Sequence, residues 1–329
     1  MTTTPPVQTL VRATRIEGAP APYDTAHVWV TYPARDERID AIGTLAASAA
    51  GVPFPLFVWF PGMGTDPAYY RWLLQAVARA GFVAVTVSHV GQVPPGLVGL
   101  TPGVDLTKAA PDTFGTGPVS SALGPVLDVL AEIDAPDSGT PLSGLLDLDR
   151  VALGGHSAGG TVALESHDHR WFPQVRAVAA YAAHTMASTM FGWPPKTALP
   201  LPGDCPVLLL GGSEDGLVRG SARFYGEDEA TYDPLGASLA TLPDTAGGRD
   251  SRLVMIKGAN HFSVCFPDDG GTPRAADDSP ATAPPEEVRR LICETLVHFL
   301  QFHVREDPEA GRALDALLAA SPLADVRTR

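Results

Sequence analysis

The sequence predicts an α/β fold in which a doubly wound, mainly parallel sheet carries long loop insertions over the functional site. Seven short runs rich in Val, Ile, Leu and aromatic residues alternate with helical patterns. Most of these runs are continuously apolar, as strands are when helices cover both faces of a parallel sheet. Strands separated by helices form an open sheet with right-handed crossovers. We expect one domain over residues 1–329, with a core at about 25–304 and a helical C-terminal tail at 305–329.

The expected strands begin at residues 25–32, where alternating apolar and polar side chains are typical of an edge strand. The other six are the apolar runs at 55–60, 81–87, 150–155, 175–181, 206–212 and 252–257. A first helix is expected from Asp66, an N-cap followed by proline, to Gly81, a helix terminator. The clearest helix is expected at 285–303, because its apolar residues share one face.

Long connections rich in Pro and Gly interrupt this alternation at 91–118, 189–204 and 224–250. Loops of this length are usually functional lids or disordered inserts. We therefore expect these three insertions to fold over the site and shape it. A fourth stretch, 266–285, is more polar and is predicted to be a mobile surface loop.

Composition excludes several classes of function. A formal net charge of -14 and a pI near 4.9 argue against nucleic acid as a partner, because such binding needs clustered Lys and Arg. The sequence contains neither an 18-residue apolar run nor a basic segment followed by an apolar one, which predicts a soluble cytoplasmic protein without a membrane partner. Its cysteines, Cys205, Cys265 and Cys293, lack C-x-x-C spacing and are expected to be free thiols, with a Cys265–Cys293 bridge as the alternative. The oligomeric state stays open.

A G-x-S-x-G pattern formed by Gly155, Ser157 and Gly159 follows directly on one expected strand. The segment TVALES after it is a plausible helix start. Strand, sharp turn and helix form the setting of a nucleophile elbow, in which glycines avoid collisions with neighbouring backbone. The Ser157 hydroxyl would then lie at a helix N-terminus, whose partial positive charge favours a developing oxyanion. The alternative is a structural Gly-Ser turn.

A serine nucleophile needs a base that is itself oriented by a carboxylate. Asp215 follows the strand at 206–212, and His261 follows the strand at 252–257. Functional groups in open α/β sheets lie outside the carboxyl ends of the strands, so these side chains can converge with Ser157. Glu214 is the rival acid, and we favour Asp215 for its offset from the strand.

The chain resembles the α/β-hydrolase superfamily over roughly residues 25–304. The likeness is carried by FVWFPGMG, GHSAGG, GGSEDGLV and GANHFS, in that order. The branch that it looks most like is the group of dienelactone hydrolases, polyester hydrolases and cutinases, and platelet-activating-factor acetylhydrolases. It departs from the polyester hydrolases in lacking a signal peptide, in the insertion at 224–250 and in a weakly matching loop after the second helix. These departures count against a secreted polymer substrate.

The resemblance implies a role for each matching residue. Ser157 would attack the substrate carbonyl, His261 would take and return the proton, and Asp215 would hold the imidazole. The backbone N–H groups of Met63 and Ala158 would form the oxyanion hole. His156, which precedes the nucleophile, is assigned to packing or hydrogen bonding. No cofactor is implied.

Several residues around these positions suggest a binding pocket for a small, largely apolar substrate. Its tentative members, besides Met63, are His184, Met186, Phe191, Trp193 and Phe262. The alternative is that they are ordinary structural or core residues. The run from His167 to His169 predicts a polar helix end and no metal site, because its histidines stand at i and i+2 and do not face each other.

The sequence therefore predicts a cofactor-independent serine hydrolase that cleaves a small-molecule carboxylic ester or lactone through an acyl-enzyme. A thioesterase, an amide hydrolase, or an acyltransferase or cyclase of a biosynthetic pathway would use the same triad. A catalytically silent binding protein that keeps the fold is the alternative from another class.

Overall fold

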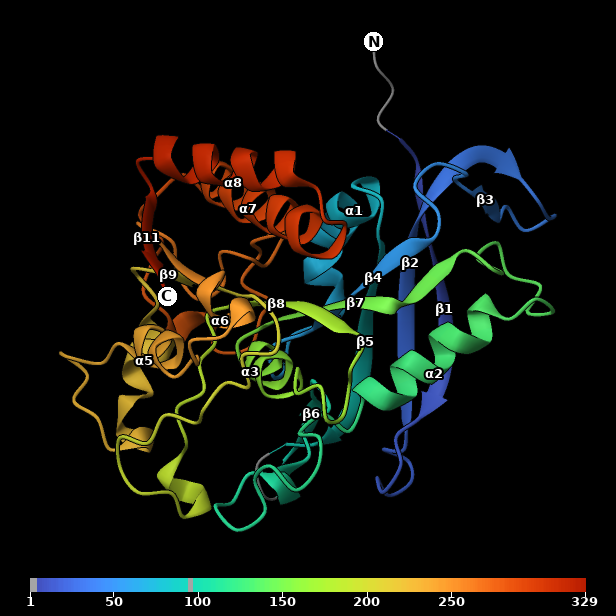
Figure 1. Ribbon diagram of the computed structural model, residues 1–329. Helices are drawn as coiled ribbons and strands as arrows, with labels where there is room; N and C mark the ends of the chain where they lie inside the picture. Colours follow the sequence, from blue (N-terminus) through green and yellow to red (C-terminus); the bar gives the residue numbers. More distant parts are fainter. Residues whose placement is uncertain (1–4, 94–96) are drawn as a thin grey trace.

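One mixed sheet of eleven strands forms the centre of the computed structural model, which describes residues 5–93 and 97–329 (Figure 1). The strands follow the order β1-β2-β5-β4-β7-β8-β9-β10-β11, and β3 and β6 pair with β2 and β5. They span Val7–Arg15 (β1), Thr25–Arg38 (β2), Leu45–Ala47 (β3), Phe54–Phe60 (β4), Val83–Gln92 (β5), Val98–Leu100 (β6), Leu146–His156 (β7), Val175–Tyr181 (β8), Val207–Gly212 (β9), Arg252–Ile256 (β10) and Ala324–Thr328 (β11).

The sheet is parallel in its central part, from β5 through β4, β7, β8 and β9 to β10. This pairing confirms the predicted mainly parallel α/β fold. It also brings the carboxyl ends of β7, β9 and β10 to the same edge of the sheet. The residues that follow these three strands therefore lie on one side of the molecule.

The helices cover both faces of the sheet (Figure 1). They are α1 (Arg71–Arg79), α2 (Leu123–Asp134), α3 (Ala158–Glu165), α4 (Gly216–Gly220), α5 (Pro234–Ala240), α6 (Ala246–Arg249), α7 (Pro285–Val304) and α8 (Pro308–Ala320). Short 3-10 turns lie at Pro67–Tyr70 (η1), Leu106–Lys108 (η2), Thr189–Phe191 (η3), Ala222–Tyr225 (η4) and Ala275–Asp277 (η5). The predicted helices at 66–81 and 285–303 correspond to η1 with α1 and to α7.

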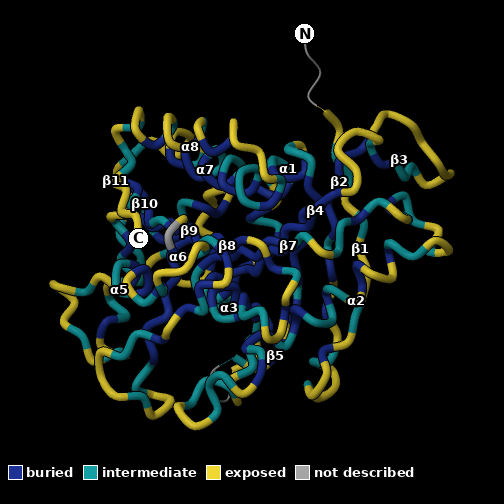
Figure 2. The backbone as a smooth tube through the Cα atoms, in the orientation of Figure 1, coloured by how far each residue is buried: buried dark blue, intermediate teal, exposed yellow. Residues whose placement is uncertain are grey.

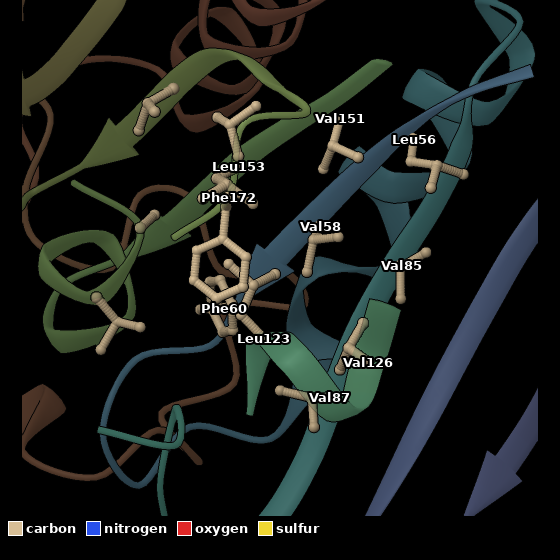
Figure 3. Packing of buried hydrophobic residues seen from close by; sticks show 14 of the residues in the cluster. Leu56, Val58, Phe60, Val85, Val87, Leu123, Val126, Val151, Leu153 and Phe172 are labelled. Atoms are coloured by element: carbon tan, nitrogen blue, oxygen red, sulfur yellow. The ribbon is translucent and has the colours of Figure 1, made fainter. Parts of the chain in front are cut away.

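Alternate residues of each central strand enter opposite halves of the core. In β4, Phe57 and Trp59 pack with α1, α7 and α8, whereas Leu56 and Val58 pack with α2 and α3. Figure 3 shows the second half, where α2 lies over β4 and β5. The strands at the centre of the sheet are buried along most of their length (Figure 2). Burial on both faces explains their continuous apolar sequences.

Two sequence predictions about the rims of the sheet are wrong. Residues 25–32 belong to β2, which is flanked by β1 and β5 and is not an edge strand. Its alternation instead reflects one face that is partly exposed, as is common in antiparallel pairs. The C-terminal tail is not wholly helical, because β11 follows α8 and pairs antiparallel with β10. Its sequence, ADVRT, is mostly exposed and carries no apolar pattern that predicts a strand.

The three insertions contain short elements and contact one another. Residues 91–118 include β6 and η2, with 94–96 outside the described part, 189–204 include η3, and 224–250 include η4, α5 and α6. The Trp193 indole N–H donates to the Ala109 carbonyl at 2.7 Å. The Lys196 backbone N–H donates to the Tyr225 carbonyl at 2.8 Å. These contacts join the insertions into one layer.

The cysteines are free, so the alternative of a Cys265–Cys293 bridge is wrong. Cys205 and Cys265 are buried, and Cys293 is half-buried. Within residues 5–93 and 97–329, no helix combines the length and the apolar character needed to span a membrane.

Candidate active site

Ser157 stands on a sharp turn between β7 and α3. Its φ of 53° and ψ of -126° lie in a region that L-residues rarely adopt, which costs about 1–3 kcal/mol. A Cβ atom at Gly155 would overlap the backbone of Gly159, and one at Gly159 would overlap the carbonyl oxygens of Phe60 and Pro61. The glycines of the G-x-S-x-G pattern are therefore sterically required. The half-buried serine lies directly before the N-terminus of α3.

Asp215 and His261 follow β9 and β10, and their side chains are hydrogen-bonded. The His261 Nδ1 atom lies 2.9 Å from Asp215 Oδ2 and 3.1 Å from Oδ1. Because a carboxylate accepts this bond, Nδ1 donates it, which leaves Nε2 as the nitrogen available for proton transfer. Both residues are buried. The rival carboxylate of Glu214 instead accepts from the Ser213 hydroxyl at 3.0 Å.

His156 links the turn at Ser157 to the loop of His261. Its Nε2 donates to the His261 carbonyl at 3.0 Å, and the two rings lie 4.7 Å apart between centroids. Burial holds the pKa of His156 well below its ordinary value, so the ring is neutral. Its Nδ1 therefore accepts from the Tyr70 hydroxyl at 2.8 Å, which in turn accepts from the Gly62 N–H at 3.0 Å. This fits the hydrogen-bonding role predicted for His156.

The serine hydroxyl and the imidazole of His261 form no direct hydrogen bond with each other, although both belong to the described part of the chain. Their loops are held together by the contact between His156 and His261. Catalytic hydrogen bonds are often long or poorly aligned until the substrate binds, when they tighten.

Met63 and Ala158 lie on two adjacent segments. The close approach of Gly159 to Phe60 and Pro61 sets the loop after β4 against the N-terminus of α3. Among the hydrogen bonds of the described residues, none is donated by the backbone N–H of Met63 or of Ala158. Two unpartnered donors beside a helix N-terminus are suited to binding an anionic oxygen.

Of the predicted pocket residues, Phe262 and His184 lie near Asp215 and His261, and Met186 donates its backbone N–H to His184 Nδ1 at 3.2 Å. The Phe262 ring lies 5.1 Å from that of His261 between centroids. Met186 and His184 are buried in the segment after β8. Burial lowers the pKa of His184 to about 4, although the nearby Asp215 carboxylate acts in the opposite direction. His184 is therefore neutral at pH 7.

The other two predicted pocket residues lie in the insertion layer. Phe191 is 37% exposed on η3. Trp193 is held by the Ala109 carbonyl and packs edge-on against Phe114. Trp193 therefore contacts another insertion, and within residues 5–93 and 97–329 neither Trp193 nor Phe191 forms a hydrogen bond or ring contact with Asp215 or His261.

Sequence reasoning missed two aromatic residues beside His184. Tyr225 and Tyr232 are stacked with ring centroids 5.9 Å apart, and the Tyr225 ring meets His184 edge-on at 5.0 Å. Both come from the insertion at 224–250. Only their aromatic character marked them in the sequence, because their approach to His184 depends on how the insertion folds.

The histidines of the His167–His169 run donate hydrogen bonds to backbone carbonyls. His167 Nδ1 donates to Leu164 at 2.6 Å, and His169 Nε2 donates to Val175 at 2.7 Å. The described residues contain no group of three or more His, Cys, Asp or Glu side chains that could hold a metal ion.

The chain resembles known proteins in its three-dimensional structure. No family model and no curated protein matches the chain. Among solved structures, it is similar to a ferulic acid esterase from Streptomyces cinnamoneus, with a TM-score of 0.62 and 20% sequence identity, over 99% of this chain and 98% of that one. At this level of identity the likeness concerns the fold. Together with the strand order and the strand–turn–helix at Ser157, it shows that the chain has an α/β-hydrolase fold.

Proposed function

We propose that this protein is a serine hydrolase that cleaves a carboxylic ester or lactone of a small, largely apolar molecule through an acyl-enzyme. The observation that carries the proposal is the buried hydrogen bond between Asp215 and His261, at the sheet edge where Ser157 occupies its strained turn. The motifs that resemble the dienelactone hydrolase, polyester hydrolase and acetylhydrolase branch support the same chemistry.

The mechanism follows from the placement of these groups. His261 Nε2 takes the proton of Ser157 while the serine oxygen attacks the carbonyl carbon, and Asp215 stabilises the imidazolium that forms. The carbonyl oxygen becomes an oxyanion that accepts hydrogen bonds from Met63 and Ala158. The imidazolium then protonates the leaving alcohol as its bond to the acyl carbon breaks. Water, deprotonated by the same imidazole, attacks the acyl-enzyme and releases the acid and the free serine.

The side chains beside the proposed acid and base favour a substrate with an apolar or aromatic group. Phe262 is apolar and lies beside His261, and the ring pair of Tyr225 and Tyr232 adds aromatic surface next to the neutral His184. The solved neighbour is described as a ferulic acid esterase, which makes esters of aromatic acids a natural part of a substrate panel.

Reaction with a fluorophosphonate tests the nucleophile directly. We expect one covalent adduct, mapped by mass spectrometry to Ser157 and absent from Ser157→Ala. A protein that stays unlabelled, or that is labelled equally after this substitution, would be a binding protein or would use another nucleophile. The proposal would then fail.

A substrate panel separates the reaction classes that share the triad. We expect p-nitrophenyl esters, lactones and aromatic-acid esters to be cleaved faster than matched thioesters and amides. Added amines or alcohols should not divert most of the acyl-enzyme from water. Preferential transfer to such an acceptor would instead indicate an acyltransferase or cyclase.

A further inference from the structure

Asp278 joins the two loops that carry the proposed acid and base. Its Oδ1 accepts the backbone N–H of Gly216 at 2.8 Å, and its Oδ2 accepts the backbone N–H of His261 at 2.8 Å. Gly216 directly follows Asp215. One carboxylate therefore spans the backbone at both ends of the hydrogen bond between Asp215 and His261.

The chain around Asp278 is fastened to the same two loops. A Cβ atom at Gly216 would lie 2.7 Å from the Ser279 nitrogen, so a glycine is needed where the segments meet. The Asn260 side-chain amide donates to the Ser279 carbonyl at 2.9 Å, and the Thr282 N–H donates to the Gly258 carbonyl at 2.8 Å. Within the stretch 266–285, which the sequence predicts to be a mobile surface loop, residues 278–282 are thus hydrogen-bonded to the loops of Asp215 and His261.

The environment of Asp278 differs from that of its neighbour Asp277. Asp277 is exposed and pairs with Arg274. Asp278 is half-buried, and no Lys or Arg in the described part of the chain forms an ion pair with it. Burial and, to a smaller extent, the carboxylate of Asp215 raise the pKa of Asp278, while the backbone N–H groups act against this. Backbone N–H groups therefore hold the carboxylate of Asp278, although the nearby carboxylate of Asp215 makes a negative charge unfavourable there.

We propose that Asp278 is a positioning residue, which fixes the separation of the Asp215 and His261 loops and so aims the imidazole at Ser157. The inference rests on the proposed function and adds a residue to its machinery. Residues that do not touch the substrate but orient a reacting side chain through a rigid contact are commonly needed for full activity. Asp278 makes this contact with the backbone N–H of His261, the base, and with that of Gly216, which follows the acid Asp215.

Substitution of Asp278 in the full-length protein tests this role. Asp278→Ala removes both acceptors, and we expect kcat to fall about 10- to 100-fold with KM within about twofold of wild type. Asp278→Asn is nearly isosteric and keeps one acceptor oxygen, so it should recover part of the loss. Asp277→Asn, the matched control, should behave as wild type. If Asp278→Ala does not fold, Asp278→Asn carries the test.

A proton NMR measurement reads the geometry without any substrate. The Nδ1 proton of His261, held between His261 and Asp215, gives a low-field signal, which we expect to shift or broaden in both Asp278 variants and to stay unchanged in Asp277→Asn. An unchanged signal together with wild-type kcat would overturn the inference. A KM that rises while kcat is kept would also overturn it. Because the signal needs no turnover, failure of the proposed ester hydrolysis is distinguished from failure of the positioning role.

Discussion

Gly159 lies directly against the carbonyl oxygen of Pro61, with no room for a Cβ atom between them. Gly159 is in the first turn of α3, and Pro61 is in the loop that carries Met63. The two proposed donors to the oxyanion, on Met63 and Ala158, belong to these two segments. Their spacing is therefore set by the absence of a side chain at position 159.

Gly159→Ala should both destabilise the protein and impair turnover. The added methyl group must displace the loop after β4 or the start of α3, at a cost of about 1–3 kcal/mol. Chemical denaturation and ester kinetics measure the two effects. Gly124→Ala in α2 is the control, because a Cβ there meets nothing within 4 Å and should change stability by less than about 1 kcal/mol. Equal stability of the two variants would contradict the steric account.

Two replacements of Ser157 should separate the effect of backbone strain on stability from the effect of the hydroxyl on turnover. Both Ser157→Ala and Ser157→Gly should lower kcat on the order of 10⁴- to 10⁶-fold, because triad members act as a unit. Glycine adopts the observed φ of 53° without strain, so Ser157→Gly should be more stable than Ser157→Ala by about 1 kcal/mol. Unfolding in urea measures this difference. A less stable glycine variant would show that the turn is not strained.

Asp215→Asn should lower kcat about 10³- to 10⁴-fold, because an amide does not hold the imidazole in the required tautomer and charge state. The substitution is nearly isosteric and leaves an oxygen to cap α4 through the Val218 N–H, so folding should be retained. Glu214→Gln should change the rate less than about twofold, since this carboxylate contacts Ser213 instead of His261. The opposite ranking would make Glu214 the orienting acid.

The free energy of unfolding should fall as pH rises because of the buried carboxyl group of Glu165. It ends α3 and lines a cavity of about 170 Å³ with Trp171 and Leu201, and burial raises its pKa to about 8. An unfolded glutamate ionises near pH 4.3, so between about pH 4 and 8 the unfolded state binds fewer protons than the folded state, and stability decreases with pH.

Glu165→Gln removes this dependence and should raise the melting temperature at pH 8 more than at pH 5. Melting curves of wild type and variant across this range measure the effect. Glu132→Gln, at an exposed position of α2, serves as the control and should shift the melting temperature by the same small amount at both pH values. A constant difference between Glu165→Gln and wild type would show that Glu165 is ionised in the folded protein.

Local patterns in the sequence were sufficient for the central elements of the fold. Continuous apolar runs identified β4, β5 and β7 to β10, because burial on both faces favours apolar side chains along most of such a strand. The strands at the edges of the sheet were not predictable in the same way. β11 carries mostly exposed residues and is a strand because the edge of β10 offers it backbone partners, which is a tertiary condition.

The sequence by itself determined the elements of the candidate site that follow strand ends: the glycine-flanked Ser157, and Asp215 and His261, which the fold brings into hydrogen-bond contact. Parallel strands deliver their carboxyl ends to one edge whatever the loops between them do. Only the tertiary structure decided that Asp278 would span the two loops and that Tyr225 would face His184. Such contacts join segments far apart in the chain through hydrogen bonds and ring packing, which impose no periodicity on the residues that make them.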